Sequence, residues 1–136
     1  MLLSTLILQG YGEKDDFNCA EKILYGANQV YHLGLDQQAL KMSAGFGGGM
    51  AIESVCGALT ASIMVLGCLF VKKNAHESSK IKDLTQELFT SYGNEMHTIN
   101  CDTLKAEHRT EDLKCRKVIA KAAEILDKII EREMHI

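Results

Sequence analysis

The sequence predicts an all-α fold, a single-domain bundle of about five helices around a central hydrophobic helix. Apolar residues recur at helical spacing in several long segments, and no segment alternates apolar and polar residues as a strand does. Proline is absent, which permits long uninterrupted helices. At 136 residues, the chain has the length of one domain. We expect residues 1–136 to form one four-cysteine helical domain, with 1–16 as an N-terminal extension and 17–133 as its core.

The first half of the chain predicts two helices and a turn before the central helix. Residues 18–33 carry an apolar stripe that Gly34 can end as a C-cap, and a shorter helix opens at Asp36. The run 45–49 holds four glycines and predicts a turn, because glycine is costly inside a helix. The central helix is then expected over residues 54–72.

The second half predicts two more long helices. Ser78 or Ser79 can cap a helix with one apolar face, which Gly93 is expected to stop. Residues 94–112 are polar and irregular, with room for a single helical turn. The last helix is expected over residues 113–133, where apolar residues again recur at helical spacing.

Charge and hydropathy exclude several classes of partner. The net charge of −3, with basic residues dispersed among acids, argues against nucleic-acid binding. The uncharged segment 54–71 has borderline length for a membrane span, but its many small residues and missing aromatic belt predict a buried bundle helix and no membrane insertion.

The apolar residues 1–8 lack the basic start of a signal peptide. Five cysteines without an export signal then predict reduced, metal-bound or redox-active sulfur in the cytoplasm.

Four of the five cysteines lie at or near predicted helix starts: Cys19, Cys56, Cys101 and Cys115. Free N–H groups and the helix dipole favour negative charge there, and the thiolate is both the nucleophile and the metal ligand. The simpler interpretation is that these cysteines are small core hydrophobes. Cys68 lies in the middle of the central helix, and we interpret it as core packing. The spacing matches no known metal code, because the chain contains no C-x-x-C.

The residues around these cysteines resemble a known family. The matching segments are Asn18-Cys19-Ala20-Glu21, Gly45-Phe46-Gly47-Gly48-Gly49-Met50, Cys56-Gly57-Ala58-Leu59-Thr60, Ile99-Asn100-Cys101 and Cys115-Arg116. In order and spacing they are similar to the redox-active protein family with a C…CGAxxG…C…C pattern, over nearly the whole chain. The resemblance implies that Cys19, Cys56, Cys101 and Cys115 are the family's four cysteines. It also implies a redox or prosthetic-group role, with an iron–sulfur cluster or another soft metal as the candidate cofactor.

The sequence departs from the motif at Ala61, which stands where the pattern has its second glycine. If that glycine allows a close approach to a cofactor or a neighbouring helix, the extra methyl group narrows the site; if it only aids packing, the change is mild. We predict Gly47, Gly48, Gly49 and Gly57 as the cofactor-binding glycines. The glycine run does not match a P-loop or a dinucleotide fingerprint, so a nucleotide site is not expected.

Three further side chains lie near the cysteines in the sequence. His97 and His108 flank Cys101 and could add a ligand or a proton relay, although solvated loop histidines are the simpler interpretation. Glu53 precedes Cys56 and is either a charge near the helix start or a proton acceptor.

The first functional hypothesis is a redox-active protein. Its four cysteines, Cys19, Cys56, Cys101 and Cys115, would either cycle between dithiol and disulfide or hold an iron–sulfur or other metal cluster as metal ligands. Such a protein would exchange electrons with a redox partner protein, and a homo-oligomer is compatible with the sequence. The alternative is a non-enzymatic helical binding module in which the cysteines only pack. Shared chemistry requires the four sulfurs to gather at one end of the bundle, beside residues 45–49, with Cys56 central.

Overall fold

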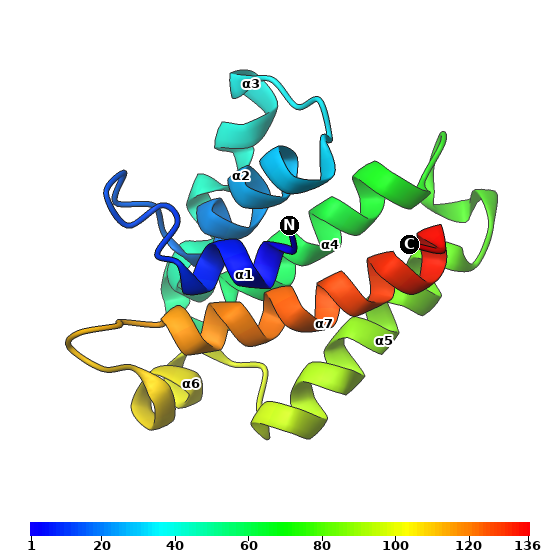
Figure 1. The fold of residues 1–136 in the computed structure, drawn as a ribbon. Helices are drawn as coiled ribbons and strands as arrows, with labels where there is room; N and C mark the ends of the chain where they lie inside the picture. The colour runs from blue at the N-terminus through cyan, green and yellow to red at the C-terminus, as the bar shows by residue number, and fades with distance from the viewer.

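The computed structural model describes all 136 residues; its regular secondary structure is entirely helical, with only two isolated β-bridges and no strand. The α-helices are α1 (Leu3–Leu8), α2 (Cys19–Tyr31), α3 (Gln37–Leu40), α4 (Gly57–Phe70), α5 (Lys80–Met96), α6 (Cys101–His108) and α7 (Arg116–Met134). Tighter or wider helical turns cover Lys41–Phe46, Gly49–Glu53 and Ala75–Glu77. In the ribbon, α4 lies in the middle and contacts α2, α5 and α7 (Figure 1). The all-α class and the central helix are therefore confirmed.

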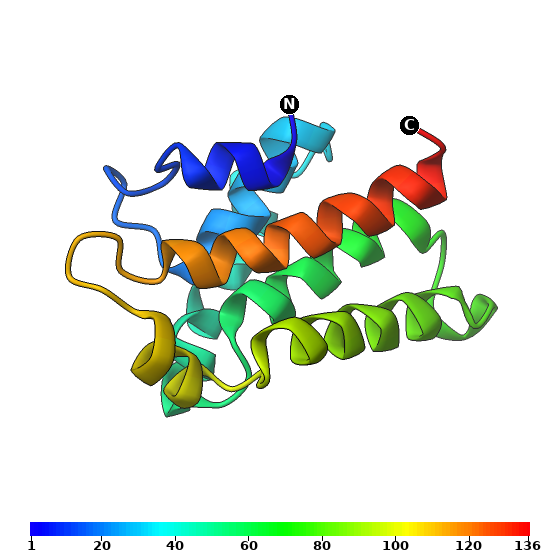
Figure 2. The ribbon, with the colours of Figure 1, turned by 60° about the horizontal axis from the view of Figure 1, so that its bottom comes forward.

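The number of helices is seven rather than about five, because two short helices were missed. One is α6, which makes two turns where a single turn was predicted. The other is α1, which lies along α7 within the segment assigned to an extension (Figure 2). Leu3 and Ile7 of α1 are almost fully buried in the hydrophobic cluster. The core therefore begins at Leu3 rather than at residue 17.

A buried carboxylate on α7 fixes α1. Asp127 is 1% exposed and accepts hydrogen bonds from the backbone N–H groups of Leu3 (3.1 Å) and Ser4 (2.9 Å). The hydroxyl of Tyr31 on α2 donates a third bond to the same carboxylate. Burial, followed by this hydrogen bond, raises the pKa of Tyr31, so the phenol stays protonated. One side chain thus satisfies two free donors at the start of α1 and joins three helices.

We expect Asp127→Asn to lower the free energy of unfolding by about 2 kcal/mol, because hydrogen bonds to a charged acceptor become neutral and one donor then faces an amide NH₂. Urea unfolding would measure the change. Tyr31→Phe, which leaves the bonds to α1 intact, should cost less. Equal stability of Asp127→Asn and the unmodified protein would show that the carboxylate does not anchor α1.

Two helices end at residues other than the predicted glycines. His32 ends α2 in the left-handed conformation (φ 54°), so Gly34 is not the cap. His97 does the same for α5 (φ 66°), and Gly93 lies inside that helix. The apolar face of α5 continues past Gly93 to Met96, which is buried. Packing of that last turn outweighs the lower helix propensity of one glycine.

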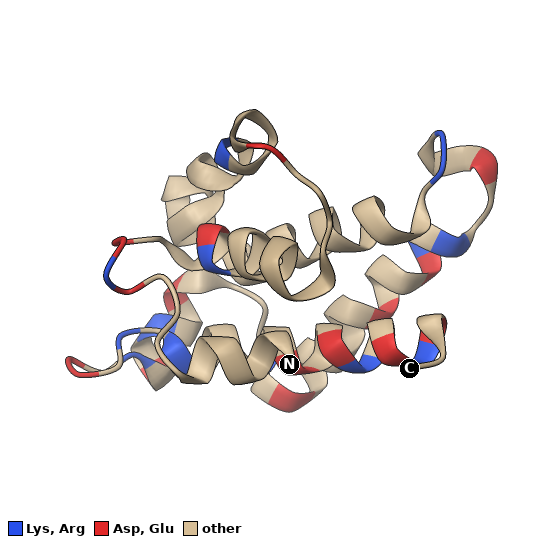
Figure 3. Ribbon diagram, turned by 45° about the horizontal axis from the view of Figure 1, so that its top comes forward, with Lys and Arg blue, Asp and Glu red and all other residues tan.

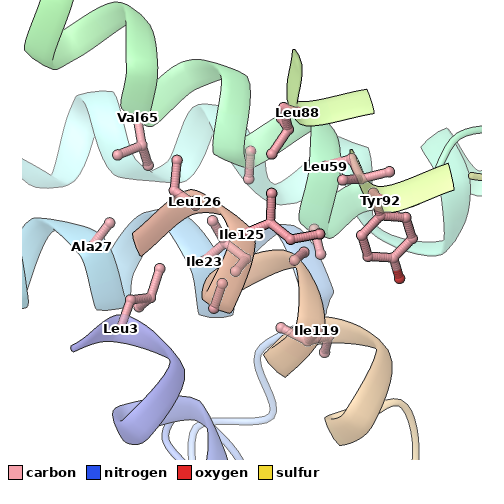
Figure 4. Packing of buried hydrophobic residues seen from close by; sticks show 14 of the residues in the cluster. Leu3, Ile23, Ala27, Leu59, Val65, Leu88, Tyr92, Ile119, Ile125 and Leu126 are labelled. Carbon is pink, nitrogen blue, oxygen red and sulfur yellow. The ribbon is translucent and has the colours of Figure 1, made fainter. Parts of the chain in front are cut away.

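The core forms where α1, α2, α4, α5 and α7 meet, and their apolar side chains point toward one another (Figure 4). The first half of α4 is buried, but its second half is only partly covered, and Cys68 is exposed. The interpretation of Cys68 as core packing is therefore wrong. None of the helices combines the length and the apolar character needed to cross a membrane.

Candidate thiol site

The four motif cysteines lie at the starts of four helices. Cys19 is the first residue of α2 and Cys101 the first residue of α6, while Cys56 and Cys115 are the N-caps of α4 and α7. These helix starts gather at the end of the bundle where α6 lies (Figures 1 and 2). All four cysteines line one cavity of about 550 Å³. The structure therefore brings them together, as shared chemistry requires.

A capping box places Cys19. The Asn18 side chain accepts a hydrogen bond from the Glu21 N–H (3.0 Å), and the Glu21 carboxylate accepts one from the Asn18 N–H (2.9 Å). The Asn18 amide also donates to the carbonyl of Ala44 (2.9 Å), which ties the start of α2 to the glycine-rich segment. This reciprocal pair fixes the first turn of α2 and thereby the position of the thiol.

An isolated antiparallel bridge places Cys56 beside Cys101. The Cys56 N–H donates to the carbonyl of Ile99 (2.9 Å), and the Cys101 N–H donates to the carbonyl of Ser54 (2.6 Å). The bridge joins the segments that lead into α4 and α6, so the two helices start side by side. Both thiols are almost fully buried.

Donors from two helix starts and from the glycine-rich loop surround the sulfur of Cys19. A hydrogen bond with the Cys56 side chain is the largest cause that lowers the pKa of Cys19, to about 6. The backbone N–H groups of Gly48, Ala20 and Gly57 lower it further, against the opposing effect of burial. Free N–H groups at helix starts stabilise a thiolate in this way. Cys19 is therefore mostly ionised at neutral pH.

The pKa of Cys56 is shifted in the opposite direction from that of Cys19. Its hydrogen bond to Cys19, followed by burial, raises its pKa well above the ordinary value of a thiol. Burial likewise raises the pKa of Cys101. Cys19 is partly exposed and Cys56 is buried. The site thus contains one accessible thiolate that is hydrogen-bonded to one protonated thiol, an asymmetry typical of functional sites.

Three of the four predicted glycines, Gly47, Gly49 and Gly57, allow close approach of the chain around this pair, whereas Gly48 has positive φ (62°) and no atom within 4 Å of its Cβ position. A Cβ on Gly57 would lie 2.5 Å from the carbonyl oxygen of Phe46 and 2.7 Å from the sulfur of Cys19. A Cβ on Gly49 would lie 2.5 Å from the backbone nitrogen of Ser54, and one on Gly47 would overlap the side chain of Asn18. A larger side chain would require a shift of the backbone at Gly49 and Gly57, and of the Asn18 side chain, which caps α2, at Gly47.

The turn after the glycines is longer than predicted. It extends beyond Gly49 to Glu53, and three residues without glycine's freedom have positive φ: Met50 (62°), Ala51 (64°) and Glu53 (56°). Each such residue costs on the order of 1 kcal/mol. The surrounding contacts, including the bridge before α4, hold this segment against Cys101.

The histidines and Glu53 do not complete the site. Neither His97 nor His108 lines the cavity. His97 ends α5, and His108 lies beside Glu107 on α6. Glu53 is exposed, and its charge is a minor cause of the raised pKa of Cys101.

Several cavity residues were not found from the sequence. Lys22 follows Cys19 by one helical turn, and Lys105 follows Cys101 by one turn, so helical spacing was the signal that could have revealed both. Arg109 and Lys114 join them from the loop before α7. Tyr92 lies near the cysteines, and burial is the main cause that raises its pKa. Its hydroxyl donates to the carbonyl of Val118 (3.2 Å).

The four thiols are the soft donors that an iron–sulfur cluster or another soft metal would use. As placed in the structure, however, no group of three or more His, Cys, Asp or Glu side chains converges closely enough to hold a metal ion. The cysteines share one cavity without forming a coordination shell. The arrangement therefore fits a pair of interacting thiols better than a preformed metal centre.

We expect Cys68→Ala to leave the redox behaviour of the protein unchanged, because Cys68 lies outside the cavity. Since the side chain is exposed, the free energy of unfolding should change by less than about 0.5 kcal/mol, rather than by the cost of a core truncation. Denaturant unfolding and thiol titration would measure both properties. A loss of redox activity in this variant would place Cys68 within the site.

A scan against protein-family models matches residues 17–129 to the family described as "Putative redox-active protein (C_GCAxxG_C_C)". The chain belongs to this family. In its central motif the chain reads Cys56-Gly57-Ala58-Leu59-Thr60-Ala61, with alanine at the last position. Ala61 is fully buried in the core, so the methyl group is a packing contact of α4 and does not line the cavity. No curated protein and no solved structure matches the chain.

Proposed function

We propose that the protein is a thiol–disulfide redox protein in which Cys19 is the nucleophile and Cys56 the resolving thiol. The observation that carries this proposal is the position of the partly exposed Cys19 sulfur against the start of α4: a Cβ on Gly57 would lie 2.7 Å from it, and the buried Cys56 lines the same cavity. The attacking thiol in disulfide exchange is most effective when its pKa lies near the ambient pH. A pKa of about 6 meets this condition for Cys19.

The reaction transfers two electrons from the protein to a disulfide. The Cys19 thiolate attacks one sulfur of the substrate; the substrate's S–S bond breaks as a mixed disulfide forms, and one substrate thiolate leaves and takes a proton from water. Cys56 then loses its proton and attacks the sulfur of Cys19. This step forms the Cys19–Cys56 disulfide and releases the second substrate thiol, which takes up a proton. The reverse sequence reduces the protein.

The difference between the pKa values of Cys19 and Cys56 assigns the order of these steps. While Cys19 is ionised, its hydrogen bond holds the proton on Cys56. Formation of the mixed disulfide removes the negative charge from Cys19, and with it the main cause of the high pKa of Cys56. Cys56 therefore ionises more easily at the step in which it attacks the mixed disulfide. Burial meanwhile protects it from direct attack by solvent oxidants.

Cys101 and Cys115 line the same cavity and are the other two thiols of the proposed site. A redox partner protein that collects the electrons is part of the proposal. The alternative, a four-thiolate cluster in electron transfer, would require the cysteines to converge further than they do here.

The test is to oxidise the reduced protein with a small disulfide and map the bonds formed. Free thiols are alkylated, the protein is digested, and peptides are identified by mass spectrometry. We expect a Cys19–Cys56 disulfide as the first product, with Cys68 alkylated. A different first pair, or no disulfide in a folded protein, would contradict the proposal. Iron and sulfide analysis of anaerobically purified protein, if positive at cluster stoichiometry, would favour the cluster instead.

A further inference from the structure

Lys22 is a largely buried lysine whose ammonium has no ion-pair partner. It is 7% exposed, lies on α2 one turn after Cys19, and lines the same cavity. Its aliphatic chain packs beside Gly12, and its ammonium forms no hydrogen bond or ion pair with the protein. The ammonium itself is not sealed in the core, because no buried side-chain nitrogen or oxygen of the protein lacks a hydrogen-bond partner. It is therefore accessible from the cavity that Lys22 lines, where an anion can reach it.

Three more cations line the cavity around this lysine, and none has an ion-pair partner within 4 Å. They are Lys105 on α6, and Arg109 and Lys114 in the loop before α7. Basic segments of α6 and of this loop gather at this end of the bundle (Figure 3). The cations thus come from three separate elements and surround one opening.

The acidic residues of the cavity do not cancel this charge. Glu13 is already paired with Arg116 (2.8 Å), which lies outside the lining. Asp16 and Asp112 are the other two acids of the lining, and both are exposed to solvent. The four unpaired cations outnumber these two acids and the Cys19 thiolate together, although Arg109 and Lys114 are exposed as well. The field of the cavity therefore attracts anions.

The size of the cavity indicates the size of its ligand. A volume of about 550 Å³ lies within the range of small-molecule sites, about 300–1,000 Å³. The partly exposed Cys19 lies in the wall of this cavity together with Lys22. A ligand held by the cations would therefore have its remaining atoms beside the reactive sulfur.

We propose that the cavity binds a small anionic disulfide, one whose S–S bond is flanked by carboxylate groups, and presents that bond to Cys19. This proposal rests on the proposed redox function and adds its substrate class. Lys22 and Lys105 hold the carboxylates. The two electrons pass from Cys19 and Cys56 to the S–S bond, which gives the protein disulfide and two molecules of a small anionic thiol.

The test compares three disulfides that differ in charge: dithiodipropionate (dianionic), hydroxyethyl disulfide (neutral) and cystamine (dicationic). Rates of Cys19–Cys56 oxidation are divided by the rates of the same reagents with a free thiol, which removes intrinsic reactivity. We expect the dianion to react about tenfold faster than the neutral reagent after this correction, and the dication slowest. Added salt should reduce the differences, because it screens the cavity charges.

Charge-removing variants assign the effect to the cavity. Lys22→Gln together with Lys105→Gln should bring the dianion rate close to the neutral rate. Lys82→Gln removes the same charge from an exposed position on α5, outside the cavity, and should leave the preference unchanged. Thiodipropionate, which has the carboxylates but no S–S bond, should inhibit the unmodified protein competitively and thus report binding without redox chemistry.

The outcomes separate the two proposals. Equal corrected rates for all three disulfides would overturn the anionic substrate and leave the thiol–disulfide function intact. No oxidation by any of them would overturn the function, whereas binding of thiodipropionate would still support an anion site. A preference that survives the double variant would place its origin outside this cavity. Reaction with acidic peptide disulfides but not with dithiodipropionate would assign the cavity to a protein partner and overturn the small-molecule proposal.

Discussion

Cys19→Ser is expected to remove the fast alkylation of the protein at low pH. At pH 6 about half of Cys19 is thiolate, whereas an ordinary thiol of pKa about 8.5 is less than about 1% ionised. Because a less basic sulfur is also less nucleophilic, the net advantage is about tenfold in rate. Iodoacetamide kinetics followed by mass spectrometry would measure it. The rate at Cys19 should fall as the pH falls through about 6, because its folded pKa is depressed and protonation removes the nucleophile.

Two variants of Cys56 separate its hydrogen bond from its chemistry. Cys56→Ala removes the largest cause of the low pKa of Cys19, so the midpoint of alkylation should rise by at least about one pH unit. Cys56→Ser keeps a donor and should retain a low midpoint. Neither variant can form the Cys19–Cys56 disulfide, so both should accumulate the mixed disulfide with a small substrate. An unchanged midpoint in Cys56→Ala would show that the thiol pair does not set the reactivity of Cys19.

Local sequence signals were sufficient to predict part of the fold and part of the site. The helix that starts at Cys19 has an amphipathic stripe, and its capping box uses residues only three apart. The last helix, α7, likewise has a strong apolar stripe. Such features depend on near neighbours in the chain, which is why both helices and the location of Cys19 at a helix start could be predicted.

Features that depend on contacts between distant segments could not be predicted. The bridge that places Cys56 beside Cys101 joins single residues, Val55 and Asn100, and leaves no pattern in the sequence. The helix α1 is only six residues long and is fixed by Asp127, more than a hundred residues away. The ionisation of Cys19 depends on donors from three segments. None of these three features can be predicted without knowledge of the tertiary structure.

The error at Cys68 has a different physical cause. The helix α4 is apolar along most of its length, so its sequence has no stripe that reveals which face is covered. Its first half is buried by α2, α5 and α7, and its second half extends beyond them on one side. A cysteine in an apolar helix was therefore assigned to the core, although neighbouring helices do not reach it.

Gly57→Ala is expected to destabilise the protein and to disturb the thiol pair at once. Its Cβ would lie 2.5 Å from the carbonyl oxygen of Phe46 and 2.7 Å from the sulfur of Cys19. Because one of these atoms belongs to the backbone, relief requires movement of α4 or of the glycine-rich segment. We expect the free energy of unfolding to fall by about 3 kcal/mol, the cost of a severe overpacking. The sulfur of Cys19 would also move away from the Gly57 N–H and the Cys56 thiol.

Gly67→Ala is the matched control for Gly57→Ala, because it adds the same methyl group to the same helix where no atom lies within 4 Å. It should raise the free energy of unfolding by about 0.5–1 kcal/mol through the higher helix propensity of alanine. Urea unfolding and the pH midpoint of Cys19 alkylation would be measured for both variants. In Gly57→Ala the midpoint should rise, since two of the donors that lower the pKa of Cys19 are displaced; in Gly67→Ala it should stay near 6. Identical midpoints would mean that the start of α4 does not determine the ionisation of Cys19, and the assignment of Gly57 to the thiol site would then fail.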